Sequence, residues 1–217
     1  MGALLHGIGI GFAIAAPVGP IGMVCVRRTL HRGVGVGLAS GLGAAVADAA
    51  YGLAVASGLA LSGWLISHST LLSLVGAALL IWMGVGMLRA FAAYTRASAA
   101  SGAAFVPERM SKRRAFAGTF ALTVTNPATI ISFVGVIAAL GPSAATSGAA
   151  FLLVLGVFLG SMLWWTTLVT LVRRARPVLS RSIRWVDLAA GVVLVGTGSF
   201  IALRVVSVMT LRLSAAV

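Results

Sequence analysis

The chain has 217 residues, of which 60% are hydrophobic and 9% are charged, and its mean hydropathy is +1.10. Soluble domains carry about 25% charged residues, so this composition excludes an ordinary soluble domain and indicates a multi-pass membrane protein. The net charge of +13 does not indicate a nucleic-acid partner, because the basic residues form clusters separated by long uncharged segments. The single cysteine, Cys25, excludes an internal disulfide and a paired-thiol redox centre.

Six apolar segments follow one another along the chain, and each is expected to form a transmembrane helix. The expected helices cover residues 4–26, 34–60, 70–90, 116–139, 148–172 and 186–206. Clusters of Gly, Ser and Pro predict tight turns within Ser62–Thr70 and Gly141–Ser147. The first segment lacks the basic start of a secretory signal peptide, so we interpret it as an uncleaved helix.

The basic residues indicate how the chain is oriented. Fourteen of the sixteen Lys and Arg residues, counting Arg89 at the end of the third expected helix, lie at the connections between the first and second, third and fourth, or fifth and sixth expected helices. The positive-inside rule places these three basic loops in the cytoplasm, so both termini are predicted to lie outside. Since the Arg-rich, Lys-poor composition is associated with GC-rich bacterial genomes, we expect a multi-pass protein of the bacterial inner membrane.

The two halves of the chain carry similar segments in the same order. Phe12–Val24 resembles Phe120–Phe133, and Leu74–Ala90 resembles Leu188–Val205. Because each half contains an odd number of helices, the second half would lie upside down relative to the first, as in many transporters. The predicted fold is therefore an all-α integral membrane protein of six transmembrane helices in two inverted three-helix repeats. The predicted divisions are residues 1–93, a basic cytoplasmic linker at 94–115, and residues 116–217.

A proline-containing interruption lies in the first helix of each half. Pro20 is expected to leave the Ala16 carbonyl without its helical donor, and Pro127 is expected to do the same to the Thr123 carbonyl. Unpaired backbone groups are costly in lipid, and broken helices line the substrate sites of transporters near the membrane midplane. A kink that only shapes packing is the alternative. The predicted substrate-site residues at the two breaks are Pro17, Gly19, Pro20, Thr125, Asn126 and Pro127.

Asp48 is the one acid near the middle of an expected transmembrane helix. A charged Asp at a helix centre costs about 2.5–3.5 kcal/mol on insertion scales, which favours a functional role. Tyr51 lies three residues later on the same helix face. We predict that Asp48 binds a proton, a substrate ammonium group, or both in turn, with Tyr51 beside it. The alternative is a protonated Asp48 that only joins helices, and Asp187 is expected to lie at the membrane interface.

No metal site, cofactor or catalytic centre is predicted. The three histidines lack the spacing of metal ligands, and efflux of a metal cation would require several acids, thiols or imidazoles around one cavity. Thiol–disulfide transfer requires paired cysteines, and aspartyl proteolysis within the membrane requires two aspartates there. The sequence therefore predicts a transporter rather than an enzyme.

Residues Ala16–Ala54 resemble the N-terminal signature of LysE-type translocators, the lysine-exporter family. The matching elements are the Pro-x-Gly-Pro break, the segment RGVGVGLASGLG and the ADAAYG segment around Asp48. Thr125–Phe133 resembles the family's Asn-Pro motif, although Ala128 stands where a Lys is frequent in the family. The resemblance covers nearly the whole chain and implies export of amino acids or other small solutes, driven by a proton gradient or the membrane potential.

We therefore expect a secondary transporter that exports a small amino-acid-like solute. Efflux of a metal cation or of another small solute by the same fold is the alternative. The expected partners are a small-molecule substrate and membrane lipid, with homo-oligomerisation left open.

Overall fold

The structure is a computed structural model, and it describes residues 2–17, 19–56, 68–100, 110–140, 147–179 and 183–214. The described residues form helices and no strand, which confirms the predicted all-α class. The helices are α1 (Gly2–Ala15), α2 (Pro20–Arg32), α3 (Val34–Ala56), α5 (Ser69–Ala100), α6 (Lys112–Val124), α7 (Pro127–Leu140), α8 (Ser147–Leu179) and α9 (Ile183–Ser214).

Four of these helices, α3, α5, α8 and α9, are each long and apolar enough to cross a membrane alone. The remaining helices form two consecutive pairs, α1 with α2 and α6 with α7, which meet at bends of 81° and 61°. If each bent pair crosses the membrane as one broken span, the described residues contain the six spans expected from the sequence. The described part of the chain is thus a multi-pass helical membrane protein with four to six candidate spans.

Four helices are longer than the sequence predicts: α2, α5, α8, which continues past residue 172 to Leu179, and α9, which continues past residue 206 to Ser214. α2 continues past residue 26 to Arg32, so Arg27, Arg28 and Arg32 belong to a helix and not to a loop. α2 ends at Gly33, whose φ of 87° lies in the left-handed region that favours glycine and whose N–H donates to the Thr29 carbonyl at 3.0 Å. α5 continues past residue 90 to Ala100 because the added residues are rich in Ala, the strongest helix former.

The remaining predictions on connections fall partly beyond the described residues. The turns within Ser62–Thr70 and Gly141–Ser147 lie mostly outside the described ranges. The predicted linker at 94–115 is described only at its two ends, where α5 finishes at Ala100 and α6 begins at Lys112. The division at residues 93 and 116 stays a prediction.

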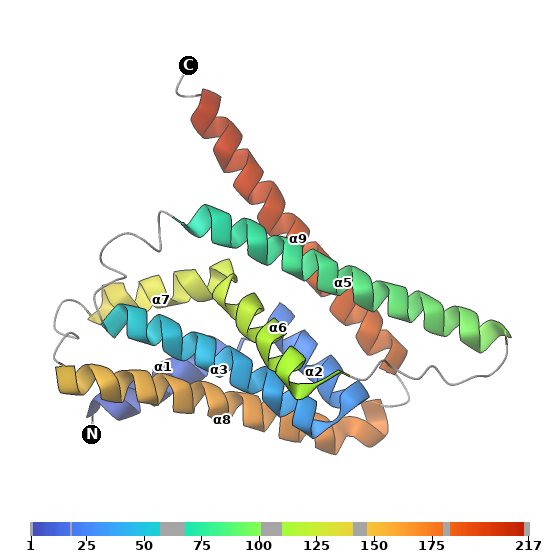
Figure 1. The fold of residues 1–217 in the computed structure, drawn as a ribbon, viewed down its shortest axis with the longest axis horizontal. Helices are drawn as coiled ribbons and strands as arrows, with labels where there is room; N and C mark the ends of the chain where they lie inside the picture. The colour runs from blue at the N-terminus through green and yellow to red at the C-terminus, as the bar shows by residue number, and fades with distance from the viewer. Residues whose placement is uncertain are drawn as a thin grey trace.

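The helices pack side by side, and α3 lies between α6 and α8 (Figure 1). α1 and α8 pack side by side with their backbones close together. A Cβ added at Gly11 would overlap the Val157 carbonyl, and one added at Gly160 would overlap the Ile8 carbonyl, so only glycine fits at these two positions. Small residues at helix contacts are the usual way in which membrane helices approach closely.

α5 and α9 cross each other on one side of the bundle (Figure 1). The C-terminal half of α9 extends away from the other helices (Figure 1), where Leu203 and Val206 are exposed. Exposed apolar side chains on a membrane-spanning helix are expected to face lipid. α2 also contacts α9, and α7 contacts α5, so both broken spans reach this crossed pair.

Candidate functional site

The first break joins α1 to α2 through Pro17 and Gly19. The last helical hydrogen bond of α1 runs from the Ala16 N–H to the Phe12 carbonyl at 2.9 Å. In the turn that follows, the Gly19 N–H donates to the Pro17 carbonyl at 2.8 Å. Pro20 is the first residue of α2, where a helix requires no N–H donor. Pro20 therefore starts a helix after the turn, whereas the sequence predicts an interruption within a single helix.

The second break joins α6 to α7 through Thr125 and Asn126, and Pro127 again starts the following helix. The Asn126 N–H donates to the Thr123 carbonyl at 3.2 Å, so the carbonyl expected to be unpaired has a donor. The Asn126 side chain accepts the Ala128 N–H at 3.1 Å and caps the start of α7. Thr125 is buried at this break. The hydrogen bonds of the polar groups at the second break are thus supplied largely by residues of the break itself.

Asp48 is buried in α3, with 3% of its surface exposed. Its Oδ2 accepts a hydrogen bond from the Ser161 hydroxyl of α8 at 2.7 Å. Ser161 Oγ in turn accepts a hydrogen bond from Trp165 Nε1 at 3.2 Å. A buried polar group is costly unless it is hydrogen-bonded, and the Ser161 hydroxyl supplies one such bond to Asp48.

Tyr51 connects α3 to the second break. Its hydroxyl donates to the carbonyl of Val124, the last residue of α6. Its ring stacks on Phe133 of α7, with 5.3 Å between the ring centroids and 21° between the planes. Tyr51 therefore contacts both helices of the second broken span.

The predicted residues are only partly brought together. Asp48 and Tyr51 reach α8 and the second break from one face of α3. The first break approaches this region through Ala15 at the end of α1, which belongs to the same buried cluster as Ala45 and Trp165. Among the described residues, no hydrogen bond joins Asp48 or Tyr51 to the first break.

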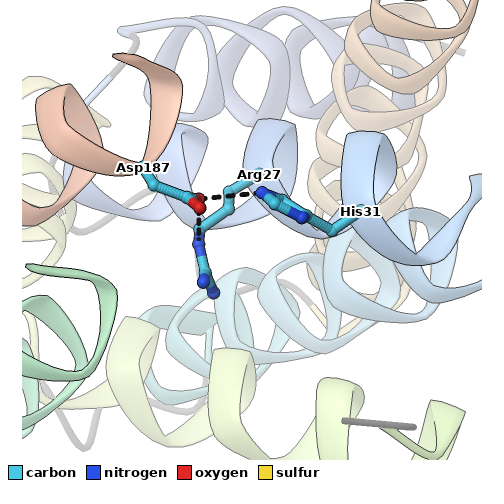
Figure 2. Close-up of polar contacts among 3 residues, drawn as sticks. All are labelled: Arg27, His31 and Asp187. Carbon is cyan, nitrogen blue, oxygen red and sulfur yellow. Dashed lines mark hydrogen bonds and ion pairs between the residues drawn. The ribbon is translucent and has the colours of Figure 1, made fainter. Parts of the chain in front are cut away.

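A second group of polar residues, not predicted as a site, lies at the basic end of the bundle. Asp187 of α9 pairs with two side chains of α2 (Figure 2): its Oδ1 lies 2.6 Å from Arg27 Nε and 2.9 Å from His31 Nε2. Asp187 is 5% exposed, so it is buried between helices. The sequence predicts that Asp187 lies at the membrane interface, but it does not predict the contacts with Arg27 and His31.

Arg28 is a buried cation on the same helix, with 5% of its surface exposed. Its Nη1 donates to Ser40 Oγ at 3.0 Å, the Ala115 carbonyl at 3.0 Å and Thr119 Oγ1 at 2.7 Å. All three acceptors are neutral, and neither of the described acids forms an ion pair with Arg28. Arg28 thus joins α2 to α3 and α6 without a carboxylate partner in the described part of the chain.

A cavity of about 800 Å³ opens beside these residues, between α2, α5 and α6. No Asp or Glu is found among the described residues of its wall, and none of the predicted site residues lines it. Its basic lining residues are Arg27, Arg28, His31, Arg32, Arg89 and Arg114.

Sequence reasoning missed both Ser161 and the Asp187 group. Ser161 carries no local signal, because serines are common in membrane helices and its partner Asp48 is 113 positions away. Arg27 and His31 did carry a usable signal, since residues four apart share a face if the helix continues past residue 26. The described residues contain no group of three or more His, Cys, Asp or Glu side chains that could hold a metal ion.

Four helices long enough to span a membrane, two bent helix pairs and a buried acid held between helices are features found in multi-pass membrane transporters. The model of the LysE type translocator family matches residues 12–204, most of the chain, and the chain therefore belongs to this family. Comparison with curated proteins and with solved structures finds no significant match. The family's members are transporters rather than enzymes, and membership indicates export of small solutes across a membrane.

Proposed function

We propose that the chain is a secondary transporter that exports a small amino-acid-like solute, driven by a proton gradient or the membrane potential. The observation that carries this proposal is the buried carboxylate of Asp48 in α3, which accepts a hydrogen bond from Ser161 of α8. An acid at this depth is expected to bind a proton or an ammonium group. Because Asp48 is 3% exposed, either ligand requires a movement of the surrounding helices to reach it.

We propose that this movement is a rocking of residues 1–93 against residues 116–217, arranged as inverted three-helix repeats. The packing of the helices supports this arrangement, because partners correspond when the halves are exchanged. α1 packs on α8 as α6 packs on α3, and α2 contacts α9 as α7 contacts α5. Asp48 with Ser161, and Tyr51 with Val124, would then each join one repeat to the other.

The two breaks offer different chemistry to a solute carboxylate. The start of α2, at Gly19 and Pro20, has no side-chain cap, whereas the start of α7 is capped by Asn126. Unpaired N–H groups at a helix start attract anions, so the first break is the better candidate for the carboxylate. Thr125, Asn126 and Pro127 would then position Tyr51 through the α6–α7 turn rather than bind the solute directly.

The solute and its driving force are constrained by simple energetics. One charge crossing 100 mV is worth about 2.3 kcal/mol, which allows a concentration ratio of roughly fiftyfold at equilibrium. The membrane potential alone could therefore drive substantial export of a solute that leaves with one net charge. Efflux of a metal cation has no supporting cluster of ligands among the described residues.

Two substitutions separate a transport role of Asp48 from a structural one. Asp48→Asn keeps an acceptor for the Ser161 hydroxyl but loses the charge and the titratable proton. Ser161→Ala removes the hydrogen bond and keeps the carboxylate. Export is measured as efflux from cells preloaded with dipeptides, with each variant's membrane level determined in parallel.

We expect Asp48→Asn to abolish efflux and Ser161→Ala to retain a reduced rate. The opposite order, in which Asp48→Asn exports normally and Ser161→Ala does not, would show that Asp48 only joins α3 to α8.

A further inference from the structure

The cavity between α2, α5 and α6 combines positive charge with a concave, partly open volume. Its volume is about 800 Å³, within the range of small-molecule sites. Five arginines contribute to its wall, and its described lining contains no Asp or Glu. Asp187 pairs with Arg27 and His31 of this wall, and the remaining excess of positive charge raises the local potential and attracts anions.

Arg28 places one of these charges at the inner end of the cavity. The described hydrogen bonds of its guanidinium start from Nη1 and end on neutral oxygens of α3 and α6. Its Nη2 points toward Gly118, where a Cβ would lie 3.3 Å away, and Gly118 itself lines the cavity. A buried guanidinium whose charge has no carboxylate partner is stabilised by an oxyanion, which it can bind with two parallel hydrogen bonds.

The arginines that line the cavity range from exposed to buried. Arg89 and Arg114 are exposed, Arg27 and Arg32 are half-buried, and Arg28 is buried. Arg27 is already paired with Asp187, which leaves Arg28 as the buried cation whose described partners are all neutral. An anion drawn in by the exposed arginines would therefore meet its tightest binding partner at Arg28.

We propose that this cavity is a binding site for the oxyanion group of a small solute, with Arg28 as the anchoring guanidinium. Resting on the proposed function, the oxyanion is the carboxylate of the exported solute, bound before it reaches Asp48. The burial of Arg28 between α2, α3 and α6 favours a small solute over a lipid, because a lipid phosphate is attached to acyl chains that must stay in the bilayer.

The test measures anion binding directly, without transport. The full chain in phosphatidylcholine nanodiscs is titrated with acetate at constant ionic strength, and the midpoint of thermal unfolding is recorded. We expect a saturable rise in the midpoint, and we expect Arg114→Gln to weaken the apparent acetate affinity about tenfold. Arg113→Gln is the matched control, since Arg113 is an exposed neighbour on α6 that does not line the cavity.

The inner position is tested by Arg28→Lys, which keeps the charge but removes the planar pair of donors. We expect this variant to lose most of the acetate response. Because Arg28 also joins α2 to α3 and α6, Arg89→Gln provides a second lining variant that breaks none of these bonds. Absence of a saturable response to acetate, or equal losses in Arg113→Gln and Arg114→Gln, would overturn the proposal.

A lipid source of the anion is distinguished by nanodiscs that also contain phosphatidylglycerol. If this lipid raises the midpoint, suppresses the acetate response and loses both effects in Arg114→Gln, a lipid phosphate occupies the cavity and the solute assignment is wrong. An intact exporter that binds no acetate would overturn the oxyanion site alone. If the wild type binds acetate but Asp48→Asn leaves efflux unchanged, only the proposed role of Asp48 is overturned.

Discussion

Asp187 of α9 and Arg27 of α2 form an ion pair, with 2.6 Å between Oδ1 and Nε (Figure 2). The two residues are 160 positions apart, so the pair ties the last described helix to the first broken span. His31, one turn after Arg27, contacts the same carboxylate oxygen at 2.9 Å. If the two halves rock during transport, this pair stabilises the conformation in which α2 and α9 are in contact.

Asp187→Asn is therefore expected to loosen the contact between α2 and α9. The loss of charge-assisted hydrogen bonds should destabilise this conformation by about 1.5–3 kcal/mol. Cys25 offers a probe, because it is the one cysteine of the chain and has 0% exposed surface on α2. Labelling of Cys25 by a membrane-permeant maleimide should be slow in the wild type and severalfold faster in Asp187→Asn.

A double-mutant cycle shows whether the pair itself is responsible. Arg27→Gln, Asp187→Asn and the double variant are compared for labelling rate and for thermal stability. We expect the double variant to be much less affected than the sum of the single variants, because it leaves no unpaired buried charge. Strictly additive effects would mean that Arg27 and Asp187 act independently.

Tyr51→Phe is expected to weaken the second break while keeping the aromatic stack. The substitution removes the hydrogen bond to the Val124 carbonyl, which should cost about 0.5–1.5 kcal/mol inside a membrane protein. Phe133→Leu is the complementary variant, because it removes the stacking partner and leaves the hydroxyl in place. If the α6–α7 turn matters for transport, Tyr51→Phe should slow efflux more than Phe133→Leu does at equal membrane levels.

The local features of this fold could be predicted from the sequence, and the reason is physical. Proline lacks an N–H donor and is disfavoured inside a helix, so both breaks could be located from Pro20 and Pro127, although Pro177 remains within α8. Asp48 was identifiable because one acid in a long apolar segment is costly wherever the helix packs. The role of Pro20 and Pro127 was harder to predict. A proline that starts a new helix and a proline that interrupts a helix differ only in whether a turn precedes the proline.

The contacts between helices could not be predicted in the same way. Whether Ser161 meets Asp48 depends on how α3 and α8 pack, and a serine in a membrane helix has no local feature that reveals a partner. The arginines at the end of α2 were assigned to a loop because the positive-inside rule counts charges without regard to helix ends. Their burial follows from the continuation of α2 to Arg32, where Gly33 ends it.

The close packing of α1 on α8 predicts a sharp difference between two glycines of α1. A Cβ at Gly11 would overlap the backbone of Val157, whereas a Cβ at Gly9 would meet nothing within 4 Å. Gly11→Ala should therefore destabilise the protein by about 1–3 kcal/mol through overpacking, and Gly9→Ala should be neutral. The midpoint of thermal unfolding in matched nanodiscs provides the comparison, and equal midpoints for the two variants would contradict the helix contact.

Reporter fusions distinguish six spans from four. If both bent pairs cross the membrane, three spans precede the connection between α5 and α6 and three follow it, so this connection and the C-terminus lie on opposite sides. If the bent pairs return to the side from which they started, only α3, α5, α8 and α9 cross, and both points lie on the same side. With the basic connection in the cytoplasm, six spans place the C-terminus outside.

Alkaline phosphatase fused after Val217 should therefore be active, and the same enzyme fused after Ala100 should be inactive. Green fluorescent protein at the same positions should give the reverse pattern, which controls for the level of each fusion. Equal activity at both positions would show that the α6–α7 pair does not span the membrane. The proposed inverted repeat would then be wrong, because a second half with two crossings cannot be an inverted copy of a first half with three.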